Sequence, residues 1–252
     1  MSKRDHRTEQ SVPDHFGADV APRYDQDHAA MYEPVVVNPA VDLLADLAAG
    51  GRALELAVGT GRIALPLAGR GVDVHGIELS QAMVDQLRAK PGGRELPVTI
   101  GDMATARADG EFSLVYLVFN TIVNLTTQAA QVACFANAAA HLLSGGCFVV
   151  EVNVPQLQRL PPGETLRAFD ASATHWGLDE VDVVSQAMTS HHFTLADGEI
   201  EHRPIPFRYV WPSELDLMAQ LAGLWLRDRF GGWSGEPFTA DSRSHVSIWE
   251  AS

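Results

Sequence analysis

The sequence of 252 residues is poor in cysteine and in long apolar runs, and each scarcity excludes a class of protein. The two cysteines, Cys134 and Cys147, are too few for a disulfide framework, so we expect reduced and packed thiols. They lack metal-ligand spacing, and we expect no metal. No run of about 18 apolar residues occurs, and residues 1–10 are polar. The sequence therefore predicts a soluble, cytoplasmic protein that does not enter a membrane.

Basic side chains are also scarce, with 18 lysines and arginines against 32 acidic residues and a formal net charge of -14. Proteins that bind nucleic acids tightly depend on Lys and Arg clusters that displace counterions from phosphates. We therefore exclude DNA and RNA as partners. The remaining composition, 46% apolar and 20% charged, is typical of a globular protein. The length predicts one large domain, or a core with a modest insertion.

Short apolar runs alternate with helical patterns between residues 53 and 154, which is typical of βα units that form a parallel sheet. The carboxyl ends of such strands share one edge, where open α/β sheets bind ligands. A helix is expected from Val35 to Gly50-Gly51. Further strands are expected at 53–58, 72–77, 97–100, 113–119 and 146–152, and helices at 62–68, 81–89 and 127–143, with Ser80 and Thr126 as N-caps and Gly145-Gly146 closing the last helix.

The pattern changes after Val154. Residues 155–177 indicate a loop with one short helix, and residues 181–194 and 200–210 predict two strands joined at Ala196-Asp197-Gly198. Ser213 is expected to cap a helix that runs to Gly223, with Asp216 as its capping-box partner. Strands at 224–229 and 245–250 follow. The predicted parts are an N-terminal arm, either disordered or a lid (1–34), a core (35–154), a cap insertion (155–207) and a closing helix with strands of the core (208–252).

The most informative segment is the glycine loop, defined here as residues 57–61, between an expected strand and an expected helix. Its glycines allow a tight turn and a close approach of backbone N–H groups to a ligand. Gly59-Thr-Gly61-Arg-Ile-Ala64 also matches the dinucleotide pattern G-x-G-x-x-A. An NAD(P)- or flavin-dependent oxidoreductase is therefore one interpretation of this loop.

Three acidic residues stand at the ends of neighbouring strands. Glu55 precedes Gly59 by four residues, and its carboxylate favours a cationic ligand over a pyrophosphate. Glu78 lies about 20 residues beyond the loop, where an acid can accept the hydroxyls of a ribose. Asp102 follows the third strand and can accept an adenine amine. Each position also has an ordinary interpretation, as a solvated acid or a helix cap.

Taken in order, these motifs resemble those of class I S-adenosylmethionine-dependent methyltransferases. The quoted motifs are Glu55-x-Ala57-x-Gly59-x-Gly61, Glu78, Gly101-Asp102-Met103, the run from Phe112 to Thr121 and the run from His141 to Val150. The resemblance covers about residues 35–154, and it departs from the family at Ala57, where Gly or Cys is more usual. It implies an α/β fold with a Rossmann-like seven-stranded, mostly parallel sheet, an antiparallel last strand, helices on both faces, and a hairpin or cap inserted after strand 5.

The resemblance further implies an enzyme that binds S-adenosyl-L-methionine and methylates an N or O atom of a small molecule, as in bacterial secondary metabolism. A cofactor-binding partner protein without catalytic activity is the second alternative. The implied cofactor contacts are Tyr24 from the arm, Glu55, Ala57, Gly59, Thr60 and Gly61 at the amino-acid end, Glu78 at the ribose, Leu79, Met83, Asp102 and Met103 at the adenine, and Phe119 and Asn120 beside the sulfonium.

The methyl acceptor leaves a weaker signal. The aromatic content of the insertion suits a small, partly apolar acceptor, or a contact in a homodimer. A general base is needed only for an acceptor that binds protonated, and a histidine suits that task. We expect His192 to be this base, with His28, His175 and His191 as other candidates, unless His191 and His192 are simply an exposed and a packed strand residue. The predicted acceptor contacts are Tyr32, Trp176, His191 and His192.

Overall fold

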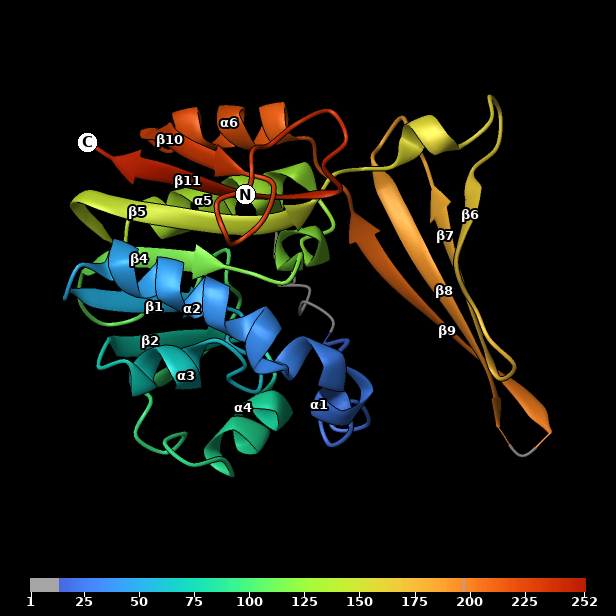
Figure 1. The fold of residues 1–252 in the computed structure, drawn as a ribbon. Coiled ribbons are helices and arrows are strands. Elements are labelled where there is room, and N and C mark those ends of the chain that lie inside the picture. The colour runs from blue at the N-terminus through green and yellow to red at the C-terminus, as the bar shows by residue number, and fades with distance from the viewer. Residues whose placement is uncertain (1–13, 197) are drawn as a thin grey trace, which may run out of the picture.

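The computed structural model describes residues 14–196 and 198–252, and these residues form two sheets (Figure 1). The larger has seven strands in the order β10-β11-β5-β4-β1-β2-β3, and the smaller has four in the order β6-β7-β8-β9. The strands are β1 (Arg52–Leu56), β2 (Asp73–Glu78), β3 (Val98–Ile100), β4 (Phe112–Leu117), β5 (Leu142–Asn153), β6 (Leu166–Ala171), β7 (His175–Val181), β8 (Ala187–Ala196), β9 (Glu199–Arg208), β10 (Leu224–Phe230) and β11 (Ser244–Ala251).

The seven-stranded sheet is mostly parallel, as predicted. β1 runs parallel to β2 and β4, and the parallel pairing continues to β3 on one side and β5 on the other. β11, the last strand, is antiparallel to both of its neighbours, β5 and β10. The carboxyl ends of β1, β2, β3 and β4 therefore meet along one edge of the sheet.

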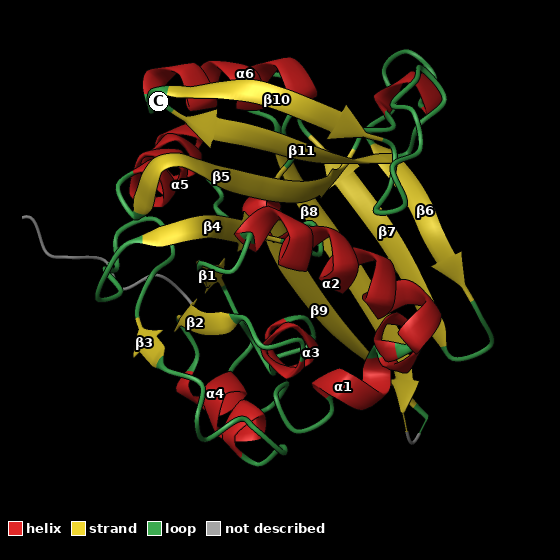
Figure 2. Cartoon of the chain, turned by 60° about the vertical axis from the view of Figure 1, so that its left-hand side comes forward, coloured by secondary structure: helices red, strands yellow, loops and turns green. Residues whose placement is uncertain are grey.

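Helices cover both faces of this sheet (Figure 2). Side chains of α2 and α3 join one buried cluster, and those of α5 and α6 join another on the opposite face. Cys134 and Cys147 are both buried free thiols, which confirms their prediction. The helices are α1 (Tyr24–Asp27), η1 (Ala29–Tyr32), α2 (Pro34–Ala48), α3 (Ala64–Gly69), α4 (Gln81–Arg88), η2 (Thr121–Asn124), α5 (Gln128–Ala139), η3 (Leu157–Arg159) and α6 (Pro212–Leu221).

The helix predicted from Val35 is α2. Pro34 occupies its first turn, where a missing N–H costs nothing, and Ala49 ends it in the left-handed conformation with φ of 50°. The buried side chains Val37, Val41 and Leu44 recur at helical spacing and face the sheet. α3 begins at Ala64, two residues later than predicted, because Arg62 and Ile63 still form a turn after the glycine loop.

The predicted end of α5 is wrong. The helix stops at Ala139, and residue 142 already pairs with Phe112 as part of β5, so that Gly145-Gly146 lies inside a strand. The sheet pairing outweighs the helical pattern of the apolar run in this segment. The N-cap is Thr127 and not Thr126, because the Thr127 side chain accepts a hydrogen bond from the Ala130 N–H at 3.1 Å. The Ser80 cap of α4 is confirmed by its bond from Met83 N–H.

The predicted capping box of α6 is also wrong. Trp211 is the N-cap residue and makes no side-chain cap, with Pro212 in the first turn. The Asp216 carboxylate instead accepts hydrogen bonds from Arg229 at 2.6 Å and from the Trp249 indole at 3.0 Å. This acid therefore ties α6 to β10 and β11.

The four-stranded sheet contains the hairpin predicted after Val154 and two further strands where a loop was predicted. β6 and β7 occupy part of residues 155–177, which were expected to be a loop, and the short helix expected there is η3. The strand expected at 181–194 is divided, because Val181 ends β7 and β8 begins at Ala187. β8 and β9 form the predicted hairpin, with Ala196 opposite Glu199. Asp197 of its predicted turn lies outside the described residues.

A buried ion pair fixes β9 to the core. Arg208 at the end of β9 donates to Glu214 of α6 at 2.8 Å and to the Gln131 side chain of α5 at 2.5 Å. Gln186, from the β7–β8 turn, donates to the other oxygen of Glu214 at 2.8 Å. This network joins β9 to α5 and α6 and so holds the second sheet against the first. Removing one partner would leave a buried charge without its counter-charge, which destabilises a protein strongly.

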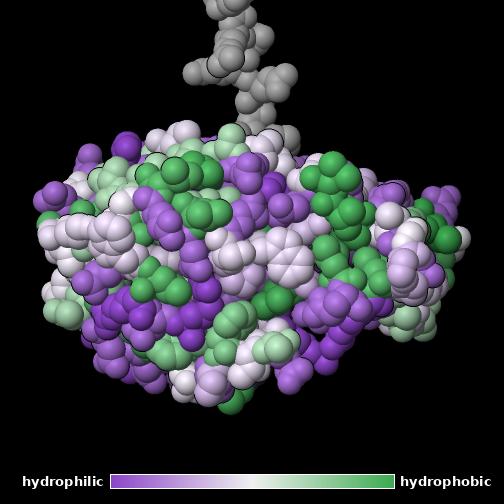
Figure 3. Space-filling view, turned by 90° about the horizontal axis from the view of Figure 1, so that it is seen from above, coloured by the Kyte–Doolittle hydropathy of each residue, from purple (hydrophilic) through white to green (hydrophobic). Residues whose placement is uncertain are grey.

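The face seen from above in Figure 3 carries hydrophobic patches separated by hydrophilic side chains. Exposed apolar side chains of α6 and β10 include Leu217, Leu221, Trp225 and Leu226. Among the described residues, no helix combines the length and the apolar character needed to span a membrane.

Candidate functional site

The glycine loop turns sharply between β1 and α3. Ala57, Gly59 and Gly61 all have positive φ, at 54°, 56° and 84°. A Cβ on Gly61 would lie 2.9 Å from the Leu65 side chain, so this position needs glycine for space as well as for conformation. The turn brings the backbone of residue 59 to the end of β2.

Glu78, at the end of β2, is held by this backbone. Its two carboxylate oxygens accept hydrogen bonds from Gly59 N–H at 2.8 Å and Ser80 N–H at 2.9 Å. Burial raises the pKa of Glu78, while these two hydrogen bonds oppose the rise. A carboxylate offers about four acceptor positions, so each oxygen keeps one for a ligand hydroxyl.

A first cavity lies at the ends of β1, β2 and β3, and we call it the strand-end cavity. Ala57, Ile77, Leu79 and Met103 give it apolar walls, and Glu78 and Asp102 place carboxylates at two sides. Asp102 accepts a hydrogen bond from Ala104 N–H at 2.8 Å through Oδ1. It therefore serves as the turn cap that its ordinary interpretation predicted, and it lines the cavity as well. Asp14, His15, Phe16, Thr121, Asn124, Leu125, Pro206 and Gly101 complete the lining.

Two predicted contacts lie beneath the glycine loop instead of in this cavity. Glu55 is 3% exposed and accepts a hydrogen bond from the Tyr116 hydroxyl at 2.9 Å. Burial raises the pKa of Glu55 to about 8, although the Tyr116 bond and the charge of Arg62 oppose this rise. Met83 is buried, and its methyl group would lie 3.7 Å from a Cβ added at Gly59. The described residues thus assign both side chains to the support of the loop.

The N-terminal arm is fastened to the glycine loop by a cluster of polar groups. Tyr32 donates to Asp25 at 2.6 Å, and the Thr60 hydroxyl donates to the same carboxylate oxygen at 2.5 Å. Lys90 forms an ion pair with Asp25 and donates to the carbonyl of residue 60 at 2.7 Å. We call this polar cluster the latch. Tyr32 was predicted to contact the acceptor, but it lies in the latch because the arm crosses the loop at this point.

Phe119 and Asn120 follow β4 in a strained turn. Both have φ of 60°, a conformation that costs non-glycine residues free energy and is common at functional sites. Glu151 holds the turn by accepting from Phe119 N–H at 2.7 Å and from the Trp233 indole at 2.9 Å. Glu151 was not predicted from the sequence, where its signal is a single acid within the apolar run of β5.

A second cavity of about 680 Å³ opens beside this turn, and we call it the histidine cavity. Its walls are the arm with Tyr24 and His28, the turn with Phe119 and Asn120, and one face of the four-stranded sheet. It shares Phe16, Thr121 and Asn124 with the strand-end cavity, so the two cavities adjoin. Its size falls within the range of about 300 to 1,000 Å³ that small-molecule sites occupy. Its further lining residues are Val20, Arg23, Asp27, Val123, His175, His192, Thr194, Glu201, Arg203, Ile205 and Phe207.

Two of these histidines form a chain that ends on an acid. Asp170 Oδ2 lies 2.5 Å from His175 Nδ1, and His175 Nε2 lies 3.2 Å from His192 Nδ1. Because a carboxylate accepts the Nδ1–H of His175, its Nε2 accepts the Nδ1–H of His192. His192 Nε2 is then left without a proton. Burial lowers the pKa of His192, and the positive charge of Arg203 lowers it further, which favours this neutral form.

His191 and Trp176, both predicted to contact the acceptor, are placed on the opposite face of the second sheet. Successive side chains of a strand point to opposite faces, so His192 in the cavity requires His191 outside it. His191 Nδ1 lies 3.0 Å from His202 Nε2, and His191 Nε2 lies 3.2 Å from Glu180 Oε2. Trp176 follows His175 in β7, and since His175 lines the cavity, the Trp176 side chain points to the outer face. Glu201 and Arg203 of β9 also line the cavity and were not predicted from the sequence. The alternation of side chains along β9 is the signal that indicates them.

The lining of the strand-end cavity has the chemistry of a nucleoside site. It combines apolar walls with three carboxylates, those of Asp14, Glu78 and Asp102. Among the described residues, His15 is the one lining side chain that could carry a positive charge, so the cavity is poorly suited to a pyrophosphate. This disfavours the dinucleotide interpretation of the G-x-G-x-x-A pattern.

Known proteins are similar to this chain over almost its whole length. Residues 53–146 match the family model described as "Methyltransferase domain". The CcbJ methyltransferase from Streptomyces caelestis is 37% identical with a TM-score of 0.81, over 97% of this chain and 99% of that chain. The cypemycin N-terminal methyltransferase of a Streptomyces species is 26% identical, over 90% of this chain and 97% of that protein. CalS10, an amino pentose methyltransferase from Micromonospora echinaspora whose structure holds the cofactor, is 20% identical with a TM-score of 0.66, over 91% of this chain and 96% of that chain.

These similarities and the fold place the protein in one class. The chain belongs to the class I S-adenosylmethionine-dependent methyltransferase family, of the type found in bacterial secondary metabolism. It is an enzyme, and its cofactor is S-adenosyl-L-methionine.

Proposed function

We propose that this methyltransferase methylates an amine nitrogen of a small molecule bound in the histidine cavity. The observation that carries the proposal is the set of groups around this cavity. Asp27 and Glu201 supply carboxylates that form no ion pair within the described chain, and they would attract an ammonium group. His192 supplies a neutral base. The cypemycin N-terminal methyltransferase, a relative along nearly the whole chain, supports nitrogen as the acceptor atom.

The cofactor would lie in the strand-end cavity. Glu78 would accept the ribose hydroxyls, Asp102 the adenine amine, and Leu79 and Met103 would contact the adenine ring. The Gly59-Thr60-Gly61 backbone would bind the amino-acid end, above Glu55. The bound cofactor supplies an activated methyl group on a sulfonium. Phe16, Thr121 and Asn124 line both cavities, so the acceptor would meet the methyl group at this junction, beside the turn of Phe119 and Asn120.

The chain's own residues would bind, orient and deprotonate the acceptor. An amine that arrives as an ammonium has no free electron pair, so it must lose a proton before its nitrogen can form the new bond. His192 Nε2 would take this proton, and the Asp170–His175 pair would stabilise the resulting positive charge. Tyr24 and Phe16 from the arm would exclude water from the reacting atoms.

The proposal is tested by a methyl-transfer screen of primary amines, secondary amines, phenols, alcohols and thiols. Each compound is incubated with enzyme and S-adenosylmethionine, and mass spectrometry records the gain of one methylene together with S-adenosylhomocysteine. We expect products from amines only. Turnover of phenols or alcohols with no turnover of amines would refute nitrogen as the acceptor.

The role of His192 is tested by His192→Phe, with His191→Phe on the opposite face as the matched control. Removal of a general base should lower kcat by about 10²- to 10⁴-fold near neutral pH, and the control should stay near wild type. The loss should shrink as the pH approaches the pKa of the amine, because the free amine needs no base. A loss that is the same at every pH would show that His192 only shapes the cavity.

A further inference from the structure

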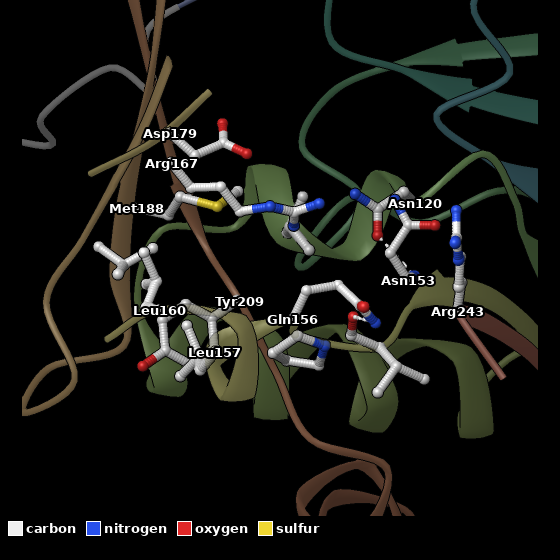
Figure 4. Close-up of a pocket in the computed structure, with 14 residues that line it drawn as sticks. Asn120, Asn153, Gln156, Leu157, Leu160, Arg167, Asp179, Met188, Tyr209 and Arg243 are labelled. Carbon is white, nitrogen blue, oxygen red and sulfur yellow. Dashed lines mark hydrogen bonds between the residues drawn. The ribbon is translucent and has the colours of Figure 1, made fainter. Parts of the chain in front are cut away.

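A third cavity, of about 290 Å³, lies on the other side of the Asn120 turn, and we call it the arginine cavity (Figure 4). It is bounded by β6, β7 and β8, by residues 153–160 after β5, and by Tyr209 and Arg243. Its residues come from the second sheet and from the segment that links the two sheets. None of them was singled out by the sequence analysis except Asn120.

The cavity has an apolar part and a polar part. Leu157 and Leu160 lie near Tyr209 and Met188 lies beside Arg167 and Asp179 on the same side, whereas Asn120, Asn153 and Arg243 lie together at the opposite end (Figure 4). The remaining lining residues are Val123, Val154, Pro155, Gln156, Arg167, Asp179 and Val181. Such a division suits a ligand segment with a hydrocarbon portion and a polar head.

The polar part is rich in hydrogen-bond donors. The guanidinium groups of Arg167 and Arg243 form no side-chain hydrogen bond or ion pair within residues 14–196 and 198–252. Arg167 extends from β6 into the cavity in Figure 4. The cavity's one acid, Asp179, accepts a hydrogen bond from Ser190 at 2.5 Å through Oδ1 and keeps its negative charge. Two guanidinium groups against one carboxylate leave the lining with a net positive charge, which favours an oxyanion.

The arginine cavity adjoins the histidine cavity. Both are lined by Asn120 and Val123. Both also use the same face of the second sheet, with Met188 of β8 in one and His192 in the other, four residues apart on the same side of the strand. A single ligand can therefore extend from one cavity into the other past Ser190.

We propose that the arginine cavity binds a second part of the acceptor, a carboxylate or related oxyanion carried on an apolar chain, while the amine lies in the histidine cavity. This inference rests on the proposed function for the identity of the ligand. The acceptor class that fits both cavities is an amine that also carries an oxyanion at the far end of a short hydrocarbon segment.

The probe is 6-bromohexanoate, whose bromine is located by its anomalous scattering, and the neutral comparison is 6-bromohexan-1-ol. Crystals of the enzyme with S-adenosylhomocysteine are soaked with each compound, and affinities are measured by calorimetric titration. The variants are Arg167→Met and Arg243→Met, which keep most of the side-chain stem. Arg159→Met is the matched control, because Arg159 is exposed on η3 beside the cavity without lining it.

We expect the bromine beside Leu160 and Met188 and the carboxylate between the two arginines. Each lining variant should weaken 6-bromohexanoate about tenfold or more, the scale of a lost hydrogen bond to a charged group, while Arg159→Met should not. The alcohol should bind more weakly to the wild type and be insensitive to all three variants. Equal affinity of the carboxylate for wild type and lining variants, or bromine density elsewhere, would overturn the inference.

The same variants separate this inference from the proposed function. With an amine substrate that carries a carboxylate, Arg167→Met should raise KM and leave kcat unchanged, and with a neutral amine it should change neither. Amine methylation without any effect of the arginines would refute the inference alone. Binding of 6-bromohexanoate in the arginine cavity with no methylation of any amine would refute the proposed function and leave the oxyanion site standing.

Discussion

Glu55 is a carboxyl group enclosed beneath the glycine loop, and its burial has a measurable cost. The side chain is 3% exposed and its pKa is raised to about 8. The perturbation that reveals this cost is Glu55→Gln, which keeps the shape and removes the ionisation. Both proteins are compared without cofactor, so that only folding is measured.

The sign follows from proton linkage. A group with a raised folded-state pKa binds its proton more tightly when folded, so its stabilising effect is full below the unfolded pKa and is lost as the pH rises through the folded pKa. With a pKa of 4.5 in the unfolded state and about 8 in the folded state, the wild type should lose about 2 to 3 kcal/mol of stability between about pH 5.5 and about pH 7.5 through this one group. Glu55→Gln should not show this part of the slope.

The assay is urea unfolding at several pH values, followed by tryptophan fluorescence and by circular dichroism to test for a two-state transition. Exposed Glu111→Gln is the control and should keep the wild-type slope. Gln at position 55 can destabilise the protein by a constant amount, since it accepts fewer hydrogen bonds, so the slope and not the absolute stability decides. Parallel curves for wild type and Glu55→Gln would refute the reasoning.

The cofactor contacts give two further predictions. Glu78→Ala should weaken S-adenosylmethionine and S-adenosylhomocysteine by about 1.5 to 3 kcal/mol in calorimetric titrations, the scale of hydrogen bonds to a charged group, and NADH should not bind to either protein. An unchanged dissociation constant would show that Glu78 does not contact the ribose. Asp25→Asn should accelerate release of the cofactor about fivefold in stopped-flow measurements, because it breaks the ion pair with Lys90 that fastens the arm, and solvent screening keeps the effect near 1 kcal/mol. Asp19→Asn, exposed on the same arm, should release the cofactor at the wild-type rate, and equal rates for both variants would exclude the latch.

Most of the seven-stranded sheet could be predicted from the sequence, because each of its central strands is a short apolar run bounded by turn residues. Ala53 and Leu54 of β1 and Leu114 and Val115 of β4 are fully buried, which produces a continuous apolar signal. The boundary between α5 and β5 could not be predicted in the same way. His141 and Leu142 fit either element by composition, and only the pairing of Leu142 with Phe112 decides between them.

The second sheet was harder to predict because its outer strand has no apolar period. β6 is mostly exposed, including Leu166 at 52% and Phe169 at 43%, and its backbone pairing with β7 stabilises it. His192 was predicted from the sequence as a general base, and this role stays a prediction. The sequence could not show which of two adjacent histidines faces inward, since that depends on the face that β8 turns toward the core.

The strain at Phe119 and Asn120 and the latch at Asp25 were likewise invisible in the sequence. The first depends on Glu151, which is 32 residues away along the chain, and the second joins residues separated by up to 65 positions. Both are tertiary arrangements in which a polar side chain satisfies the backbone or side chain of another segment.

The alternation of β9 makes the histidine cavity a surface that can be redesigned independently of the core. Glu201, Arg203, Ile205 and Phe207 face the cavity, while Arg208 alone anchors the strand through its buried ion pair. Phe207 also packs against the core, so a combinatorial library restricted to the other three positions would alter the shape and charge of the cavity with little effect on the folding of the seven-stranded sheet. The same arrangement offers natural selection a short route to new acceptors, one side chain at a time.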